Sequence, residues 1–373
     1  MINRDRMVKE FCELVAIDSL SLKEREMADL LKTKMADLGF EVYEDDAGKK
    51  AGGNAGNLIC RHKGRENVPS ILFMAHMDTV VPGLGKKAIV DGDYIKSDGT
   101  TILGADDLSG VEIILEAIRS IKEDNVEHGD IEVVFSIAEE LGLVGARNLD
   151  FSKINSKFGY VLDSGSKGSV VVGSPFQDVY DITVYGKASH AGVEPEKGIN
   201  AIVIASEAIA GMKLGRVDEE TTANVGAISG GQATNIVCDR VNIKAEARSR
   251  NEAKLIEQAE HMKQCFLDAA KKHGGNVDFK AERHYAGYKI MKDDPALKLY
   301  EEASKMAGAE VNPISMNGGS DANIMNEKGI RTLNISMGAE QYHTVNEVAD
   351  IKEMIKMAGI LVNIVRLVAQ GGM

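Results

Sequence analysis

The chain has 373 residues, of which 44% are hydrophobic, so it is long enough for two domains with buried cores. Its 57 acidic and 44 basic residues give a net charge of −13, which argues against nucleic acid and anionic membranes as partners. No apolar stretch approaches membrane-spanning length, residues 1–6 lack a signal-peptide core, and the four cysteines form no close pair. These features predict a soluble cytoplasmic protein.

Helical and extended patterns alternate over the first 160 residues. Apolar residues at helical spacing predict two helices near the start of the chain. Two short strands are expected next, on either side of a Gly- and Lys-rich loop at 47–55. Three more apolar strands and two helices follow. In chain order, the predicted elements are helices at 5–16 and 27–38, strands at 40–44, 57–62, 70–75, 131–137 and 158–162, a helix after residue 104 and a helix that ends at Leu149.

One of these strands leads directly into a histidine. The apolar run 71–75 is followed by His76, and Asp78 comes after one further residue. Residues i and i+2 of an extended chain point to the same side, so both side chains should project from the carboxyl end of a core strand. A histidine supported by a carboxylate is typical of metal sites. Alone, the pair would better suit a buried histidine beside a turn aspartate.

The next two apolar strands end in acidic residues as well, the first at Glu139 and Glu140 and the second at Asp163. Asp106 and Asp107 precede a helix, where N-capping alone would explain them. Grouped carboxylates repel and raise each other's pKa unless a cation lies among them. The repeated pattern therefore predicts a metal site at these strand ends.

The pattern changes near residue 174, where a β-α-β-β-α-β order begins that is typical of ferredoxin-like domains. After residue 285 the α/β pattern resumes. The sequence predicts an α/β fold with a mixed, mostly parallel sheet flanked by helices, formed by residues 1–173 and 286–373. An α+β domain at 174–285 is inserted into it.

The last part of the chain adds two candidate site segments. Gly318 and Gly319 precede a helix that begins near Ser320, which suits an oxyanion or carboxylate cradle or only a tight turn. His343 lies in a loop after a strand predicted at 331–336.

Seven motifs in this order resemble the di-zinc exopeptidase family that includes peptidase T, aminoacylase, dipeptidases and glutamate carboxypeptidases. The motifs are MAHMDTV, GADDLSG, AEELGLVGA, LDSG, GKASHAGVEPEKGINA, GGSDANI and YHTVNE. EELGLVGARNLD and GGSDANIMNEKGI are most similar to the peptidase T branch. The resemblance implies that 174–285 is a lid and that subunits form a homodimer through it.

The resemblance also implies two zinc ions per subunit, with cobalt or manganese as alternatives. At the matching positions, His76 and Asp163 would hold one ion, and Glu140 and His343 would hold the other. Asp106 would bridge the two ions, as in other two-metal sites.

Further roles are implied by the same resemblance. Asp78 would orient His76, and the bond between Asp106 and Asp107 would be cis. Glu139 would be the general base, taking a proton from a metal-bridging water and returning it to the leaving amine. Spacing alone does not decide which of the two adjacent glutamates is the base.

The inserted domain carries candidate substrate contacts. By resemblance, His190 would donate to the oxyanion, within its own subunit or across a dimer, although alone it would be a surface histidine. Asn235 and Arg248 are candidate contacts for a substrate carboxylate, with Arg250 as a competitor.

The sequence thus predicts a metallo-exopeptidase that hydrolyses short peptides and releases the N-terminal residue of tripeptides. One alternative is an aminoacylase or carboxypeptidase acting on N-acyl amino acids. Another is a non-catalytic peptide-binding protein on the same scaffold.

Overall fold

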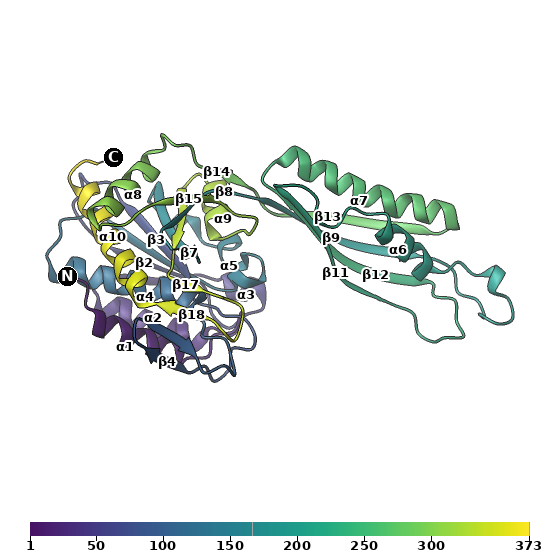
Figure 1. Ribbon diagram of the computed structural model, residues 1–373, viewed down its shortest axis with the longest axis horizontal. Helices are drawn as coiled ribbons and strands as arrows, with labels where there is room; N and C mark the ends of the chain where they lie inside the picture. The colour runs from purple at the N-terminus through teal and green to yellow at the C-terminus, as the bar shows by residue number, and fades with distance from the viewer. Residues whose placement is uncertain (166, 373) are drawn as a thin grey trace. The chain divides into compact units, whose positions relative to one another are not determined.

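The computed structural model describes residues 1–165 and 167–372, which form two compact units (Figure 1). Unit 2 comprises Gly173–Tyr288 and the short segment Met316–Gly319, and unit 1 comprises the rest of the chain. The boundaries predicted from the sequence were 173/174 and 285/286. The short segment Met316–Gly319 of unit 2 lies outside the predicted boundaries.

A nine-stranded sheet forms the centre of unit 1. Its strands are β1 (Glu41–Glu44), β2 (Leu58–His62), β3 (Ile71–His76), β6 (Ile131–Ser136), β7 (Phe158–Ser164), β8 (Ser169–Ser174), β14 (Tyr288–Lys289), β15 (Asn312–Ser315) and β16 (Arg331–Ser336). They are ordered β1-β2-β6-β3-β7-β16-β8-β14, and β15 pairs with β8. The four middle strands β6, β3, β7 and β16 are parallel, whereas β2 and β8 join them antiparallel. The predicted α/β fold class is confirmed.

The parallel strands β3, β6 and β7 are mostly apolar, as expected of strands that are covered on both faces. Every residue of β3 and of β6 is buried. The helices of unit 1 are α1 (Arg4–Val15), α2 (Arg25–Asp37), α3 (Ala47–Ala51), α4 (Ala105–Glu123), α5 (Val144–Arg147), α8 (Pro295–Met306), α9 (Asp321–Glu327) and α10 (Ile351–Ala369). Of these, α4 packs on β3 and β7, and α9 packs on β7 and β16.

Two predicted segments differ from the structure. The expected loop at 47–55 contains α3, whose end at Gly52 adopts the left-handed conformation that glycine allows. The helix expected to end at Leu149 is only the four-residue α5, preceded by a 3₁₀ turn at Glu139–Leu141. Short glycine-punctuated helices lack the long apolar periodicity that identifies a helix from sequence.

A second, four-stranded sheet in unit 1 joins distant parts of the chain. Its strands are β4 (Ala88–Asp91), β5 (Tyr94–Ser97), β17 (Ala339–Glu340) and β18 (Val348–Asp350), in the order β17-β18-β5-β4. The loop between β17 and β18 carries His343. Among the described residues, no helix has the length and apolar character needed to cross a bilayer.

Unit 2 is an antiparallel sheet with two helices on one face (Figure 1). Its elements are β9 (Phe176–Tyr185), α6 (Ala201–Ala210), β10 (Gly215–Arg216), β11 (Thr221–Gly230), β12 (Arg240–Ser249), α7 (Glu252–His273) and β13 (Asn276–Tyr285). The strand order β10-β11-β12-β9-β13 is the ferredoxin-like order with one added edge strand. Alternate residues such as Tyr180, Ile182 and Val184 of β9 face the helices and form the core.

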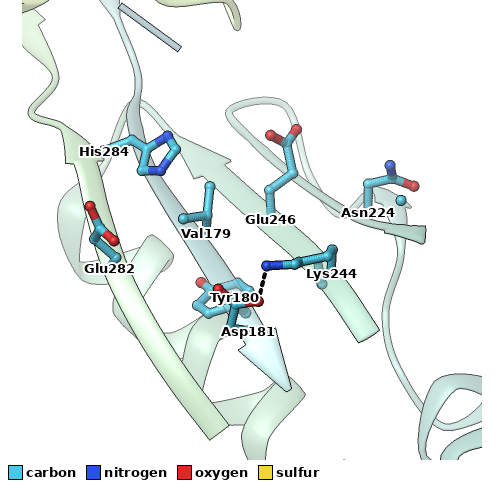
Figure 2. A pocket seen from close by; sticks show the side chains of 10 residues that line it. Val179, Tyr180, Asp181, Asn224, Lys244, Glu246, Glu282 and His284 are labelled. Atoms are coloured by element: carbon cyan, nitrogen blue, oxygen red, sulfur yellow. Dashed lines mark ion pairs between the residues drawn. The ribbon is translucent and has the colours of Figure 1, made fainter. Parts of the chain in front are cut away.

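The other face of this sheet is polar. A cavity of about 420 Å³ lies on this face. Figure 2 shows side chains that line it, among them Asp181, Lys244, Glu246 and His284. Lys244 forms an ion pair with Asp181. None of the candidate site residues lines this cavity.

Candidate metal centre

The candidate ligands follow strands that run parallel, so they come from one edge of the sheet. In the register of β3 and β6, His76 lies opposite Ser136, and Glu139 and Glu140 follow three and four residues later. Asp163 is the penultimate residue of β7, which pairs in parallel with β3. Parallel neighbours end at the same edge, and this is where ligand sites occur in open α/β sheets.

Asp106 lies between the two candidate histidine ligands. Its Oδ1 is 3.1 Å from Nε2 of His76, and its Oδ2 is 3.3 Å from Nε2 of His343. Nε2 of His343 is also 2.7 Å from Oε1 of Glu140. His76, Asp106 and Glu140 each offer one ligand atom, and these three atoms lie within 4.8 Å of one another, as a metal site requires. The structure thus brings four of the five predicted ligands into direct contact.

Asp163, the fifth, is held through its backbone. Its N–H donates to Oδ1 of Asn334 at 3.1 Å, and Asn334 Nδ2 donates back to its carbonyl oxygen at 3.2 Å. Burial and the neighbouring charge of Asp106 raise the pKa of Asp163 well above its usual value. Burial and the charge of Asp163 likewise raise the pKa of Glu139. The two carboxyl groups therefore share one poorly solvated environment with the ligands.

Asp78 connects the first ligand strand to the glutamate pair. Nδ1 of His76 is 3.0 Å from the Asp78 carbonyl oxygen and 3.3 Å from its Oδ1. With a metal bound, this contact would hold the ring proton on Nδ1 and leave Nε2 as the ligand atom. The Asp78 carboxylate also accepts the N–H groups of Glu139 at 2.9 Å and Glu140 at 3.3 Å, and the hydroxyl of Ser21 at 2.6 Å.

The capping interpretation of the aspartate pair applies to Asp107. Its Oδ1 accepts the N–H of Gly110 at 3.1 Å, and its Oδ2 accepts the N–H of His76 at 3.1 Å. The peptide bond between Asp106 and Asp107 is cis. The first aspartate is thus left to face the histidines.

The electrostatics suit a cationic occupant. Hydrogen bonds to Asp106 and Glu140 raise the pKa of His343 to about 10. Burial opposes ionisation of Asp106, but the two histidines outweigh it and lower its pKa to about 2. Imidazole nitrogens with carboxylate oxygens are the donor set of zinc and related divalent ions in catalytic sites. The residues present therefore fit a metal centre.

Three buried carboxylates beside this site were not identified from the sequence. Glu347 accepts three backbone N–H groups of the segment that presents Asp106. Glu24 accepts the N–H groups of Leu22 at 2.7 Å and of Ala138 at 3.1 Å. Asp321 accepts the Ser136 hydroxyl, and burial raises its pKa to about 6.

These contacts join residues that are far apart in the chain. An acidic residue in a loop or at a helix start gives no sequence signal of its distant partners, although the GGSDANI and YHTVNE motifs do contain Asp321 and Glu347.

In unit 2, His190 and Asn235 lie on adjacent segments. An isolated antiparallel bridge joins His190 to Ile236, and the N–H of Ala191 donates to the Asn235 carbonyl oxygen at 3.0 Å. Nδ1 of His190 accepts the N–H of Gly192 at 3.2 Å. The structure thus brings these two predicted substrate residues together.

The arginines and the glycine turn belong to the other end of unit 2. Arg248 pairs with Glu246 at 3.0 Å, whereas Arg250 donates to Asn317 Oδ1 and, at 3.1 Å, to the Glu219 carbonyl oxygen. The Gly318 carbonyl oxygen accepts the Ser174 hydroxyl at 3.2 Å. A Cβ at position 319 would lie 2.3 Å from Cζ of Tyr285, so the approach of this ring requires glycine there.

Comparisons with known proteins point to one family. Residues 72–367 match the model of Peptidase family M20/M25/M40. The chain is 47% identical to the uncharacterized protein YqjE of Bacillus subtilis (strain 168), over 99% of this chain and 100% of YqjE. The crystal structure of aminopeptidase PepT from Bacillus cereus ATCC 10987 is 46% identical, covers 99% of both chains and has a TM-score of 0.89. A tripeptidase from Staphylococcus aureus subsp. aureus Mu50 is 41% identical, covers 99% of this chain and 100% of its own, and has a TM-score of 0.93.

An α/β unit with imidazoles and carboxylates gathered at parallel strand ends, together with these matches, defines a peptidase with a candidate metal site. The chain belongs to Peptidase family M20/M25/M40. This confirms the family and the enzyme class predicted from the seven motifs.

Proposed function

We propose that the protein is a zinc-dependent exopeptidase that releases the N-terminal residue of short peptides, tripeptides foremost. The observation that carries this proposal is the contact of Asp106 with both His76 and His343, with Glu140 beside them. The names of the two solved relatives, an aminopeptidase and a tripeptidase, support the choice of substrate.

The residues of unit 1 would hold two ions. His76 and Asp163 would hold one, Glu140 and His343 the other, and Asp106 lies between the histidines as a bridging ligand should. When bound, the ions would supply Lewis acidity at the scissile carbonyl and lower the pKa of water to about 7. Cobalt and manganese suit the same donors and are alternative outcomes of a metal analysis.

Glu139 is the proposed general base. Its carboxyl group is buried, and burial together with the charge of Asp163 raises its pKa, which favours a group that accepts a proton and later releases it. Glu139 would take a proton from the attacking water and donate it to the departing amine. Asp78 fixes the backbone of Glu139, which keeps the base oriented through both transfers.

Unit 2 would act as the lid that binds the substrate. We assign Asn235 and Arg248 to the substrate carboxylate, because an amide and a guanidinium suit that group, and His190 to the oxyanion of the tetrahedral intermediate. Because Asn235 and Arg248 lie at opposite ends of unit 2, one carboxylate would receive these two contacts from two different subunits. Gly318 and Gly319 would offer backbone N–H groups near the substrate. The ion pair of Arg248 with Glu246 would have to rearrange for Arg248 to grip a carboxylate.

We also infer a homodimer through unit 2. Strand β10 pairs with β11 at only two positions, so beyond Ala223 the described part of β11 has a strand on one side only. Ile228 on this edge and Ile202 and Val203 on α6 are more than 40% exposed, and Ile202 lies against Gly231, which follows β11. An apolar, open strand edge favours pairing with a second copy.

A cytoplasmic location is part of the proposal. All four cysteines of the chain are free thiols in the structure. Cysteines that stay reduced are typical of cytosolic proteins.

The test compares substrates and the metal on one preparation. Zinc-loaded protein is assayed with free-amine tripeptides, with the corresponding dipeptides and with N-acetylated amino acids, while its metal content is measured. We expect the fastest release of the N-terminal residue from tripeptides, and we expect Glu139→Gln to retain metal but lose turnover. Preferred hydrolysis of N-acetyl amino acids would instead establish an aminoacylase. Peptide binding without hydrolysis would establish a binding protein.

A further inference from the structure

Glu347 is completely enclosed yet lies outside the proposed ligand set. Its side chain is 1% exposed. Oε2 accepts the N–H groups of Leu103 at 2.8 Å and Gly104 at 2.7 Å, and Oε1 accepts the N–H of Asp106 at 2.9 Å. One carboxylate therefore binds the backbone of the segment that presents the proposed bridging ligand.

The same residue anchors the loop that carries His343. Glu347 ends the β17–β18 loop, and its N–H donates to the Thr344 carbonyl oxygen at 3.2 Å. Its own carbonyl oxygen accepts the N–H of Ser97 at 3.4 Å. This hydrogen bond lies beside the residues through which β5 pairs with β18. Asp106 and Glu347 are 241 positions apart in the chain, so this carboxylate joins two distant segments.

We propose that Glu347 is a positioning residue that fixes the separation of Asp106 and His343 and thereby completes the site for the second of the two metal ions. The proposal rests on the metal assignment made above. Glu347 holds both loops, and its two carboxylate oxygens are occupied by backbone N–H groups. Its effect on catalysis is exerted through the two ligands.

The local geometry explains why a carboxylate is needed. Both oxygens are used and all three partners are donors. Glutamine would turn an amide N–H toward one of them and leave it unsatisfied in a buried place. The segment has little room to adjust, because Gly104 has φ +78° and a Cβ there would lie 3.1 Å from Thr79 and 3.2 Å from Lys86. A defect at Glu347 should therefore displace Asp106 itself.

Glu132 provides a matched control. It is also fully buried, and its two oxygens accept the backbone N–H of Asn155 at 3.0 and 3.1 Å and that of Ser156 at 2.9 Å. It occupies the second position of β6, whereas the candidate ligands follow the opposite end of that strand. Glu132→Gln thus makes the same kind of defect away from the proposed ligands.

The experiment titrates zinc alone into metal-free wild type, Glu347→Gln and Glu132→Gln, and records thermal midpoints. We expect both variants to lose stability, but only Glu347→Gln to bind the weaker of two zinc ions at least tenfold less tightly, in the range typical of residues that support metal ligands. With tripeptides, kcat should fall in Glu347→Gln while KM changes little, because the lid contacts are untouched.

Other outcomes overturn the proposal. Wild-type zinc affinity in Glu347→Gln would do so, as would an equal loss in Glu132→Gln. If Glu347→Gln does not fold, Glu347→Asp replaces it: its carboxylate is drawn back by one methylene, and unchanged zinc affinity there also overturns the proposal. A wild type that binds two zinc ions but hydrolyses no peptide would refute the proposed function and leave this comparison intact.

Discussion

Oδ1 of Asp78 accepts the backbone N–H of Glu139 at 2.9 Å. The same carboxylate supports His76 through its ring Nδ1 at 3.3 Å. A proposed ligand and the proposed base thus share one buried anchor. We expect Asp78→Asn to lower kcat/KM or zinc affinity about 10–100-fold, as loss of a ligand's hydrogen-bonded support typically does. Steady-state kinetics and zinc titration of the variant measure this.

Ser21→Ala is the control for that variant. It removes the hydroxyl that donates to Asp78 Oδ2 at 2.6 Å but leaves the acceptor for Glu139 in place. Its activity should stay within a few-fold of wild type. An Asp78→Asn enzyme as active as Ser21→Ala would show that the anchor is dispensable.

Removal of metal should destabilise unit 1. Without ions, the carboxylates of Asp106, Glu140 and Asp163 repel one another in a buried place, and burial raises the pKa of the latter two. A ligand at one hundred times its Kd stabilises by about 2.7 kcal/mol, so EDTA should lower the thermal midpoint of the zinc-loaded protein. Zinc should restore it, whereas calcium, which prefers all-oxygen ligands, should not. A midpoint that does not respond to EDTA contradicts the metal assignment.

The features that sequence reasoning found are those that repeat locally. An apolar strand followed by His76, and later by Asp163, was visible because a buried parallel strand is a continuous apolar run that ends where the ligands begin. The ferredoxin-like order of unit 2 was visible because its strands alternate in polarity. Both patterns lie within a few residues of chain.

The features that were missed depend on distant contacts. Nothing near Glu347 indicates that it accepts three N–H groups from residues 103–106, because those partners lie more than 240 positions away. From the sequence, Gly319 suits an anion cradle or a tight turn. The structure gives it a different constraint, the ring of Tyr285. Only the folded chain identifies such pairs.

Acid stability should depend on Glu44. Burial favours its protonation, but hydrogen bonds from Arg25, Lys32 and the N–H of Gly56 outweigh this and lower its pKa to about 2 from 4.5. A carboxyl group with a lowered folded-state pKa stabilises the fold above the unfolded-state pKa, and this stability is lost as the pH falls from about 4.5 to about 2.

Glu44→Gln should therefore reduce the free energy of unfolding at pH 7 by about 1 kcal/mol, because Glu44 and its partners Arg25 and Lys32 are partly exposed. The difference from wild type should vanish near pH 2. Denaturant unfolding at a series of pH values measures this. Glu127→Gln is the control, because Glu127 pairs with Arg65 in an exposed position, where ion pairs contribute little. A Glu44→Gln difference that persists at pH 2 would contradict the assignment.

The subunit in which His190 acts can be decided by mixing two inactive variants. Glu139→Ala lacks the proposed base, and His190→Ala lacks the proposed oxyanion donor, so each homodimer should be nearly inactive. If His190 acts across the dimer, a mixed dimer has one site in which the base comes from one subunit and the histidine from the other. Complete exchange at equal amounts should then restore about a quarter of wild-type activity, because half of the dimers are mixed and each has one complete site.

Ile228→Lys in both variants, which places charge on the open edge of β11, should abolish this recovery and give monomers in size-exclusion chromatography. Mixed dimers that form but stay inactive would place His190 within its own subunit.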